Sequence, residues 1–374
     1  MTSRDRSAVA LSLFSAVLLL MGCTPPPSHS HRTAAPARPA PAASQETPAE
    51  PPIHAAPPKA PVQSETLGSL EAPIDPDFSR WLAGVREEAL KKGIRAATLD
   101  QALAGLKPIP RVIELDRNQP EFKLTYAQYL EKVLPAARIA KGRRMLAENR
   151  ALLERISGTY GVPARYLVAF WGIESDFGRI TGGFPVIAAL ATLAHDGRRS
   201  TFFRRELMNA LKIVDEGHVT AGAMVGSWAG AMGQCQFMPS SFVRFAVDGD
   251  GDGRKDLWTS KADVFASAAN YLAASGWKRS QDWGMEVKLP PRFDRRLGGG
   301  DQKRTLATWD ALGIRDTRGR PLPRLGIQAA LIEPEPDNPP AFLVFDNYAT
   351  ILKWNRSMFY ALAVGQLADA IGGR

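Results

Sequence analysis

A 50-residue segment near the start of the chain limits where a folded domain can form. Residues 24–73 consist largely of Pro and Ala with scattered Ser, Glu and His, and they contain no Phe, Trp or Tyr. A segment of this composition cannot bury enough apolar surface to offset the entropy lost on folding, and it is typical of an extended tether. The sequence therefore predicts that the folded part begins near residue 74.

The residues before this tether indicate export. A short charged head at residues 4–6 precedes an apolar run over residues 8–21. A membrane-spanning helix needs roughly 20 apolar residues, so this shorter run is typical of a secretory signal. The run ends in LLMGC, which resembles a bacterial lipobox and implies cleavage before Cys23 and lipidation of its thiol. The alternative is an ordinary signal followed by a chance cysteine. Because Thr24 and not Asp follows, we expect the periplasmic face of the outer membrane.

The cysteine count determines how an exported domain can be stabilised. Cys235 is the only cysteine besides Cys23. If Cys23 carries lipid, no disulfide can form within the chain, so the fold must depend on its hydrophobic core alone. A chain of 374 residues with 45% hydrophobic residues has enough material for such a core.

The formal net charge of +9 favours a polyanionic partner. For an exported protein, cell-wall polymer or an anionic lipid surface fits better than nucleic acid, and we find no aromatic-basic motif for nucleic-acid binding. Cell-wall synthases as further partners leave no readable signal in the sequence. Basic runs can also be ordinary solvated helix faces.

Hydrophobic periodicity predicts a mainly helical chain. Apolar residues three and four apart recur through residues 75–160 and again from residue 348 to 372. Further helices are expected at residues 163–175, 201–217, 239–247 and 263–276. Between them and the last helix, Pro and Gly become frequent and short strand-like runs occur at residues 285–290, 326–334 and 340–345. The fold class predicted is α+β, mainly α, with a small β insertion before a closing C-terminal helix.

These patterns divide the chain into six predicted segments. They are a signal peptide (1–22), the lipidated cysteine with its tether (23–73), an N-terminal helical domain (74–160), a catalytic core (161–284), a small β-rich domain (285–345) and a C-terminal helix that completes the helical part (346–374).

The stretch WGIESDFG, residues 171–178, places Glu174 at the end of a strongly apolar run. On a helix, three apolar residues located seven, four and three positions earlier share its face: Leu167, Phe170 and Trp171. Burial disfavours the charged carboxylate and raises its pKa, which suits a general acid working near neutral pH. We expect Gly178 to end the helix beside a cleft. The alternative is a last-turn glutamate that points to solvent, the common case.

ESDFG after an apolar helix resembles the Glu-Ser signature of the lysozyme-like lytic transglycosylases. Further blocks resemble, in the same order, the membrane-bound lytic murein transglycosylase B family; they lie at residues 184–207, 226–258, 263–277 and 348–367. This resemblance covers essentially everything after the tether. It implies a lysozyme-like catalytic core.

The resemblance also implies a reaction. That family cleaves the β-1,4 bond between N-acetylmuramic acid and N-acetylglucosamine in peptidoglycan and leaves a 1,6-anhydromuramic end. Most glycosidases need two carboxylates, whereas one glutamate serves this family as acid and then as base. The resemblance assigns both roles to Glu174 and implies no organic cofactor. Asp176 is the rival second carboxylate, but two residues along a helix it points away from the same face.

The strip GAMGQCQFMPSS, residues 230–241, has Gly and Ala where a backbone must approach a ligand closely. It lacks the Gly-Lys-Ser/Thr of a phosphate loop, and a plain tight turn is the alternative. The resemblance places it in the wall of a glycan groove, where the predicted contacts are Ser227, Gln236, Phe237 and Met238. It also implies substrate contacts for Arg198, Arg199, Asn270, Tyr271, Trp354 and Tyr360, with the two arginines near the anionic lactyl group or peptide stem. Core packing remains an alternative role for the aromatic residues.

The stretch DGDGDGRKDLW, from Asp248, resembles the start of an EF-hand calcium loop because carboxylates occupy positions 1, 3 and 5 and a glycine occupies position 6. Thr259 replaces the usual glutamate at position 12. The resemblance implies a longer loop closed by Asp263, whose alternative role is N-cap of the next helix. The predicted ligands of a structural Ca²⁺ are Asp248, Asp250, Asp252, Arg254, Asp256 and Asp263. Sodium or an empty site is the alternative.

The leading prediction is a lipid-anchored lytic transglycosylase, and two other functions remain open. A non-catalytic peptidoglycan-binding lipoprotein would keep the groove without the chemistry, but Glu174 with its apolar face, Ser175 and Gln236 argues against it. A muramidase-type hydrolase is the closer rival, and the mass of the product ends would separate it. The isolated His195 and His218 are typical of surface or satisfied core residues.

Overall fold

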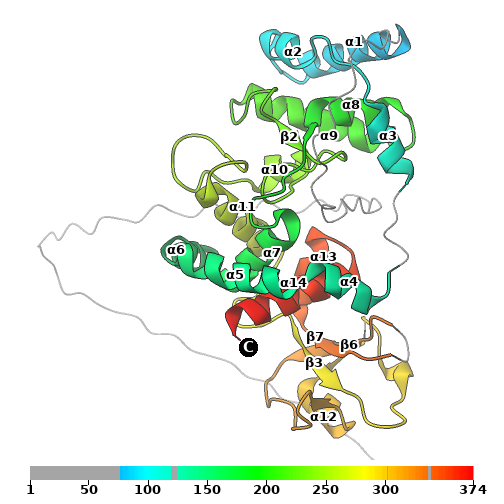
Figure 1. Ribbon diagram of the computed structural model, residues 1–374, viewed down its shortest axis with the longest axis vertical. Helices are drawn as coiled ribbons and strands as arrows, with labels where there is room; N and C mark the ends of the chain where they lie inside the picture. Colours follow the sequence, from blue (N-terminus) through cyan, green and yellow to red (C-terminus); the bar gives the residue numbers. More distant parts are fainter. Residues whose placement is uncertain (1–75, 119–123, 301, 336–337, 374) are drawn as a thin grey trace, which may run out of the picture. The chain divides into compact units, whose positions relative to one another are not determined.

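The computed structural model describes residues 76–118, 124–300, 302–335 and 338–373 (Figure 1). The predicted signal peptide, Cys23 and the predicted tether up to residue 73 lie outside the described residues. Within these ranges, no helix has both the length and the apolar character needed to cross a membrane.

The first part of the described chain is helical, as predicted. Its helices are α1 (Pro76–Lys91), α2 (Ala96–Ala102), α3 (Pro110–Arg117), α4 (Tyr126–Val133), α5 (Ala136–Glu148) and α6 (Arg150–Tyr160). The continuous helical pattern from Tyr126 onward is divided into three helices. Pro135 is the N-cap of α5, and Asn149 stands between α5 and α6. Gly161, with φ of 77°, closes α6 in the left-handed conformation.

The central part contains the helix that ends with Glu174 and Ser175. Its elements are α7 (Ala164–Ser175), β1 (Phe184–Pro185), α8 (Val186–His195), α9 (Ser200–Asp215), β2 (Val225–Gly226), α10 (Pro239–Phe245) and α11 (Lys261–Ala274). The two short strands pair antiparallel. Almost every residue of α7 is buried, because α5, α6 and α11 all pack against it. An apolar helix surrounded in this way fixes the position of its last turn.

A five-stranded antiparallel sheet follows, in the order β4-β6-β7-β3-β5. Its elements are β3 (Gly284–Lys288), a 3₁₀ helix (Arg295–Leu297), β4 (Lys303–Thr305), α12 (Leu306–Ala311), β5 (Arg315–Asp316), β6 (Gln328–Ile332) and β7 (Ala341–Val344). Alternate residues of β7 enter different cores, since Phe342 belongs to the large core and Leu343 to a smaller one with Trp309 of α12. The sheet therefore forms the boundary between two cores.

The C-terminal segment forms two helices where the sequence indicated one. α13 (Asp346–Trp354) and α14 (Met358–Gly372) are separated by a break at residues 355–357. The Ser357 side chain caps α14 by accepting a hydrogen bond from the backbone N–H of Tyr360. α14 packs against α7 (Figure 1). The break brings Trp354, at the end of α13, and Tyr360, in the first turn of α14, to the same place beside α7.

The predicted fold class is confirmed. The described chain is α+β and mainly α, with one small sheet between the central helices and the C-terminal helices. One large hydrophobic core joins helices from the N-terminal, central and C-terminal parts, and the small core lies on the other side of the sheet.

Candidate active site

The end of α7 is an unusual turn. Asp176, Phe177 and Gly178 all have positive φ, at 48°, 59° and 78°. The helix therefore ends at Ser175, earlier than the break expected at Gly178. The N–H of Asp176 donates to the carbonyl of Gly172 at 3.1 Å, as in an αL motif, and the N–H of Phe177 donates to the carbonyl of Trp171 at 3.1 Å. A Cβ at Gly172 would lie 2.8 Å from the Phe177 ring, so a glycine is required where that ring folds back.

The Glu174 side chain lies in apolar surroundings. It shares a small cavity with Leu167, Phe170 and Trp171, as its position on the helix predicted, and Trp354 closes the other side. Glu174 itself is half-buried. The alternative of a glutamate pointing freely into solvent is wrong for this structure.

Two hydrogen bonds reach the same oxygen of Glu174. Its Oε1 accepts one from Trp354 Nε1 at 2.8 Å and one from the Tyr360 hydroxyl. Burial raises the pKa of Glu174 to about 7, and the two hydrogen bonds act against that rise. Burial and the neighbouring Glu174 raise the pKa of Tyr360 well above its usual value, so that hydroxyl remains a donor. A carboxyl with this pKa exchanges its proton near neutral pH.

A second carboxylate does not act on Glu174 within the described residues, since burial and these two hydrogen bonds account for its pKa shift. The rival Asp176 forms ion pairs with Arg179 at 2.5 Å and Lys141 at 3.4 Å. Its carboxylate is thus held by cations, while Glu174 has none.

Four of the predicted groove residues meet beside Glu174. The Trp354 ring centroid lies 5.2 Å from that of Phe237 and 4.8 Å from that of Tyr271. The Tyr271 hydroxyl donates to the carbonyl of Lys353 at 2.6 Å. Phe237 and Tyr360 are buried, whereas Tyr271 and Trp354 keep part of their surface exposed. The two half-exposed rings are the ones that can offer a face to a ligand.

The glycine-rich strip folds back on itself next to this cluster. Met232 and Phe237 exchange backbone hydrogen bonds at 2.8 and 3.1 Å, and Ser227 Oγ accepts the N–H of Ala231 at 3.0 Å. Gln236 has φ of 50°, and its Nε2 donates to the carbonyls of Thr181 and Gly233. The donors of this amide are engaged by backbone, so its oxygen is the atom left to face a ligand.

The remaining strip residues lie at its edge. Met238 is half-buried at the N-cap of α10. Asn270 is half-buried on α11 and donates to the carbonyl of Phe245 at 2.9 Å.

Gln234 makes contacts that the sequence reasoning missed. Its Oε1 accepts from Trp171 Nε1 at 2.8 Å, and its carbonyl accepts from Ser175 Oγ at 2.8 Å. On the other side, its Nε2 donates to the carbonyl of Trp258 at 2.8 Å. Gln234 thus connects both ends of the last turn of α7 to the segment after the aspartate loop. The available signal was a polar residue placed between glycine and cysteine in an otherwise apolar strip.

Arg198 and Arg199 lie apart from the aromatic cluster, because both bond to the buried Asp116 of α3. Arg198 donates to the Asp116 carboxylate at 3.0 Å and to its carbonyl at 2.7 Å. The Arg198 side chain is still 55% exposed, so it can also contact a ligand. Asp116 was not singled out in the sequence, since only the fold brings it near residues 82 positions away.

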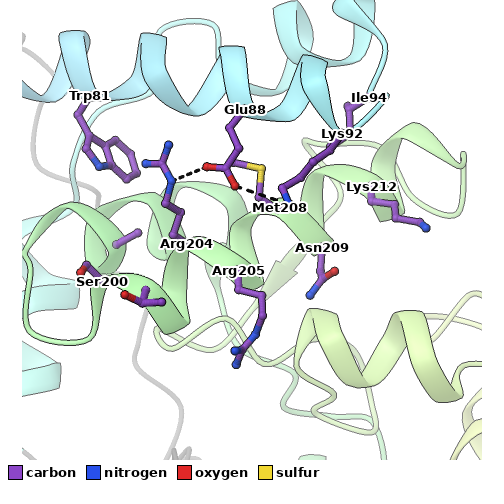
Figure 2. Close-up of a pocket in the computed structure, with 12 residues that line it drawn as sticks. Trp81, Glu88, Lys92, Ile94, Ser200, Arg204, Arg205, Met208, Asn209 and Lys212 are labelled. Atoms are coloured by element: carbon purple, nitrogen blue, oxygen red, sulfur yellow. Dashed lines mark hydrogen bonds and ion pairs between the residues drawn. The ribbon is translucent and has the colours of Figure 1, made fainter. Parts of the chain in front are cut away.

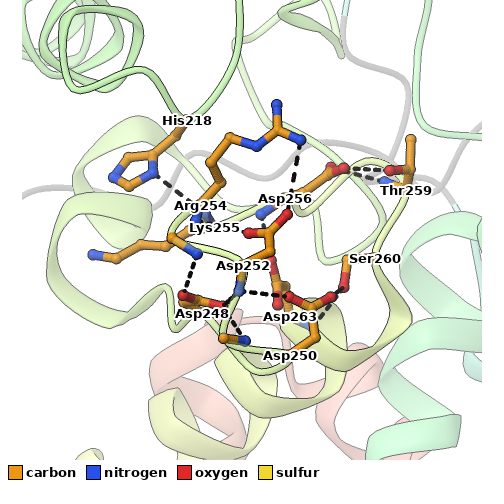
Figure 3. A network of polar contacts seen from close by, with 12 residues as sticks. His218, Asp248, Asp250, Asp252, Arg254, Lys255, Asp256, Thr259, Ser260 and Asp263 are labelled. Atoms are coloured by element: carbon orange, nitrogen blue, oxygen red, sulfur yellow. Dashed lines mark hydrogen bonds and ion pairs between the residues drawn. The ribbon is translucent and has the colours of Figure 1, made fainter.

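The aspartate loop gathers three carboxylates (Figure 3). Oxygens of Asp248, Asp250 and Asp252 lie within 4.8 Å of one another. The backbone N–H of Gly253, and then that of Gly251, hydrogen-bond to Asp248 and lower the pKa of its carboxyl. Three carboxyl groups on a tight loop fit a hard divalent cation such as Ca²⁺.

The other predicted ligands have backbone partners. Asp263 is buried and accepts the N–H of Gly249 at 2.7 Å and that of Asp256 at 2.5 Å, so it ties both sides of the loop to α11. The N-cap of α11 is Ser260, and the alternative N-cap role for Asp263 is therefore wrong. Asp256 accepts from Trp258 and Thr259. The Arg254 side chain lies 3.7 Å from Asp252.

The two histidines have structural surroundings. His195 packs edge-on against Phe78 and Trp81. His218 Nδ1 accepts the N–H of Lys255 at 3.2 Å.

Known proteins resemble this chain over most of its length. A family model described as "Transglycosylase SLT domain" matches residues 77–369. The chain is 30% identical over 292 residues to "Membrane-bound lytic murein transglycosylase B" of Escherichia coli (strain K12), which covers 75% of this chain and 79% of that protein.

Solved structures give the same result. SltB3 from Pseudomonas aeruginosa, in complex with NAG-anhNAM-pentapeptide, is 47% identical with a TM-score of 0.77 and covers 79% of this chain and 80% of its own. Escherichia coli Slt35 in complex with calcium is 29% identical with a TM-score of 0.66 and covers 80% of this chain and 93% of its own. These matches confirm the fold that the sequence resemblance implied.

Proposed function

The chain belongs to the transglycosylase SLT family and is a peptidoglycan lytic transglycosylase, and from this premise we propose that Glu174 performs both proton transfers of the reaction. Family membership decides against the non-catalytic and hydrolytic alternatives. The observation that carries the proposal is a half-buried carboxyl with a pKa of about 7 that has two hydrogen-bond donors and, among the residues that the structure describes, no carboxylate partner.

In the first step, Glu174 acts as general acid. Its proton passes to the glycosidic oxygen as the bond from that oxygen to the muramic C1 breaks, and the N-acetylglucosamine hydroxyl leaves. Because Trp354 and Tyr360 both donate to Oε1, Oε2 is the oxygen that carries the proton toward the substrate. The two donors then stabilise the carboxylate that forms.

In the second step, the same carboxylate acts as general base. It takes the proton of the muramic C6 hydroxyl while that oxygen attacks C1, so the 1,6-anhydro bond forms and no water is consumed. The muramic N-acetyl group or protein dipoles stabilise the cationic intermediate. A pKa near 7 serves both steps because neither protonation state of Glu174 is strongly disfavoured.

The substrate is a glycan strand that carries peptide stems. SltB3 was solved with a pentapeptide-bearing disaccharide, and the half-exposed rings of Tyr271 and Trp354 support a sugar site here. Ser227, Gln236, Phe237, Met238 and Asn270 border this groove, with Tyr360 beneath it. The exposed part of Arg198, with Arg199 behind it, faces the anionic stem.

Two further assignments complete the proposal. Asp248, Asp250 and Asp252 hold a structural Ca²⁺ that neutralises their charge and stiffens the loop, as their converging oxygens support. Slt35 was solved with calcium. Cys23, outside the described residues, carries a lipid that anchors the enzyme to the outer membrane; the relative from Escherichia coli is named as membrane-bound.

Purified sacculi test the role of Glu174. We expect the Glu174→Gln variant to lose on the order of 10²- to 10⁴-fold in release of soluble muropeptides, since amide replaces acid and base at once. Mass spectrometry of wild-type products should show ends lighter by one water than reducing ends. The matched control is Asp176→Asn, which should retain most activity. Equal release by Glu174→Gln and wild type would refute the proposal.

A further inference from the structure

A cavity of about 490 Å³ lies between α1 and α9, on residues that the Glu174 site does not use (Figure 2). α1 contributes Trp81 and Glu88, the turn after it contributes Lys92, and α9 contributes Arg204, Met208 and Lys212. Its volume lies within the range of about 300–1,000 Å³ that is usual for ligand sites. A single small ion would not fill this space.

The charge around the cavity is strongly unbalanced. Four cationic side chains line it, namely Lys92, Arg204, Arg205 and Lys212, against the single carboxylate of Glu88. Glu88 is shared, because Arg204 bonds to it at 2.6 Å and Lys92 lies 3.8 Å from it, as Figure 2 shows. Lys212 has only an exposed partner, Glu216, at 3.5 Å. An exposed pair such as Lys212–Glu216 contributes little and is readily exchanged for a ligand.

The cavity also offers apolar contact surface. The Trp81 ring is half-exposed. It stacks on Phe78, and the Arg204 guanidinium lies 5.3 Å from its centroid. The buried side chains of Met208 and Ile94 also line the cavity. A ligand that fits must therefore combine several negative charges with aliphatic parts. An acidic peptide has this composition.

We propose that the cavity between α1 and α9 binds the carboxylate groups of a peptidoglycan stem peptide, as a second substrate contact separate from the catalytic groove. This inference rests on the proposed function, which supplies strands that carry peptide stems. Stems recur along a strand, so a strand bound in the groove presents further stems to the protein. Such a second contact strengthens binding of peptide-bearing strands without entering the chemical steps.

A binding measurement with the full chain tests this. The probe is a free stem pentapeptide, titrated by calorimetry into wild type and into the Lys92→Gln/Lys212→Gln variant. We expect the variant to bind about tenfold more weakly, because two attractive charges are removed. Binding should weaken further with added salt, and a peptide with amidated carboxylates should bind less well.

The matched control is Lys91→Gln/Lys132→Gln, which removes two exposed lysines outside the cavity and should bind as wild type does. Thermal unfolding confirms that each variant is folded. Equal pentapeptide affinity of the cavity variant and wild type, or no binding to wild type, overturns the inference. Binding of anionic lipid vesicles in place of the peptide also overturns it and makes the cavity a membrane contact.

Kinetics separate this inference from the function on which it rests. The cavity variant should raise KM for peptide-bearing strands and leave kcat unchanged, with no effect on strands stripped of peptide. Glu174→Gln should slow cleavage by on the order of 10²- to 10⁴-fold and leave pentapeptide binding intact. Retained cleavage by Glu174→Gln defeats the proposed function, whereas unchanged kinetics of the cavity variant defeats the second contact alone.

Discussion

The fold shifts the pKa values of two carboxyl groups, those of Glu174 and Asp248, in opposite directions. Glu174 sits among apolar side chains at the end of α7, where burial raises its pKa to about 7. Asp248 starts an open loop, where backbone N–H groups led by that of Gly253 lower the pKa of its carboxyl. The apolar environment favours the protonated form of Glu174, and the backbone donors favour the ionised form of Asp248, which can bind a cation. Residue type alone therefore assigns neither role.

The kind of donor also differs between the two sites. At Glu174 the donors are two side chains, Trp354 and Tyr360, from different helices. At Asp248 they are neighbouring backbone N–H groups of one tight loop, which glycines at 251 and 253 permit with φ of 82° and 90°. A local loop can be recognised from sequence, whereas a pair of donors 180 and 186 residues away cannot.

The largest effect on stability should come from the proton on Glu174. Its folded pKa of about 7 exceeds the usual 4.5, so the folded state binds the proton more tightly and stability falls as pH rises from 4.5 through 7. The shift corresponds to about 3 kcal/mol at most. We expect Glu174→Gln to be more stable than wild type at pH 8 and to lose that advantage at pH 4, as measured by denaturant unfolding. A constant difference between the two pH values would contradict burial as the cause.

Binding of Ca²⁺ at the aspartate loop should change the stability of the protein by a comparable or smaller amount. A ligand that binds only the folded state, present at a concentration of 100 times its Kd, stabilises that state by about 2.7 kcal/mol. We therefore expect added Ca²⁺ to raise the Tm of wild type by several degrees and to leave the Tm of Asp250→Asn/Asp252→Asn nearly unchanged. A control with Mg²⁺ tests selectivity, since that ion requires a smaller octahedral shell. Equal Tm shifts in wild type and the variant would mean that the ion binds at another site.

The smallest effect should come from removing one donor to Glu174. Trp354→Phe keeps an aromatic ring and loses the N–H that stabilises the carboxylate, so the pKa of Glu174 should rise by about one unit, or about 1.4 kcal/mol. The alkaline limb of the kcat profile should move to higher pH. Tyr271→Phe is the control, because its hydroxyl bonds to the Lys353 carbonyl and not to Glu174. An unmoved limb in Trp354→Phe would show that this hydrogen bond does not tune the acid.

Sequence periodicity was sufficient where contacts are local. It placed Glu174 on the face of Leu167 and Phe170, and the spacing of the EF-hand-like motif located the three loop aspartates, because helix and turn geometry fix these relations within a few residues. Short apolar runs bounded by Pro and Gly also predicted three strands of the small sheet, β3, β6 and β7, whereas β4 and β5 were not predicted.

Sequence reasoning failed where tertiary packing overrides local preference. The left-handed turn after α7 begins at Asp176 and Phe177, not at a glycine, because the Phe177 ring is held between Gly172 and Lys141. The pairing of Arg198 with Asp116 depends on how α3 meets the loop before α9. Tertiary contacts also explain the break between α13 and α14. It allows Trp354 and Tyr360 to hydrogen-bond to the same oxygen of Glu174.

The amide of Gln234 has a mechanical consequence. Its side-chain amide bonds to Trp171 on one side and to Trp258 on the other, and the backbone carbonyl of Gln234 accepts from Ser175. A displacement of the segment after the aspartate loop is therefore transmitted to the last turn of α7, which positions Glu174. A change in the aspartate loop would then lower catalytic activity before it unfolds the protein as a whole.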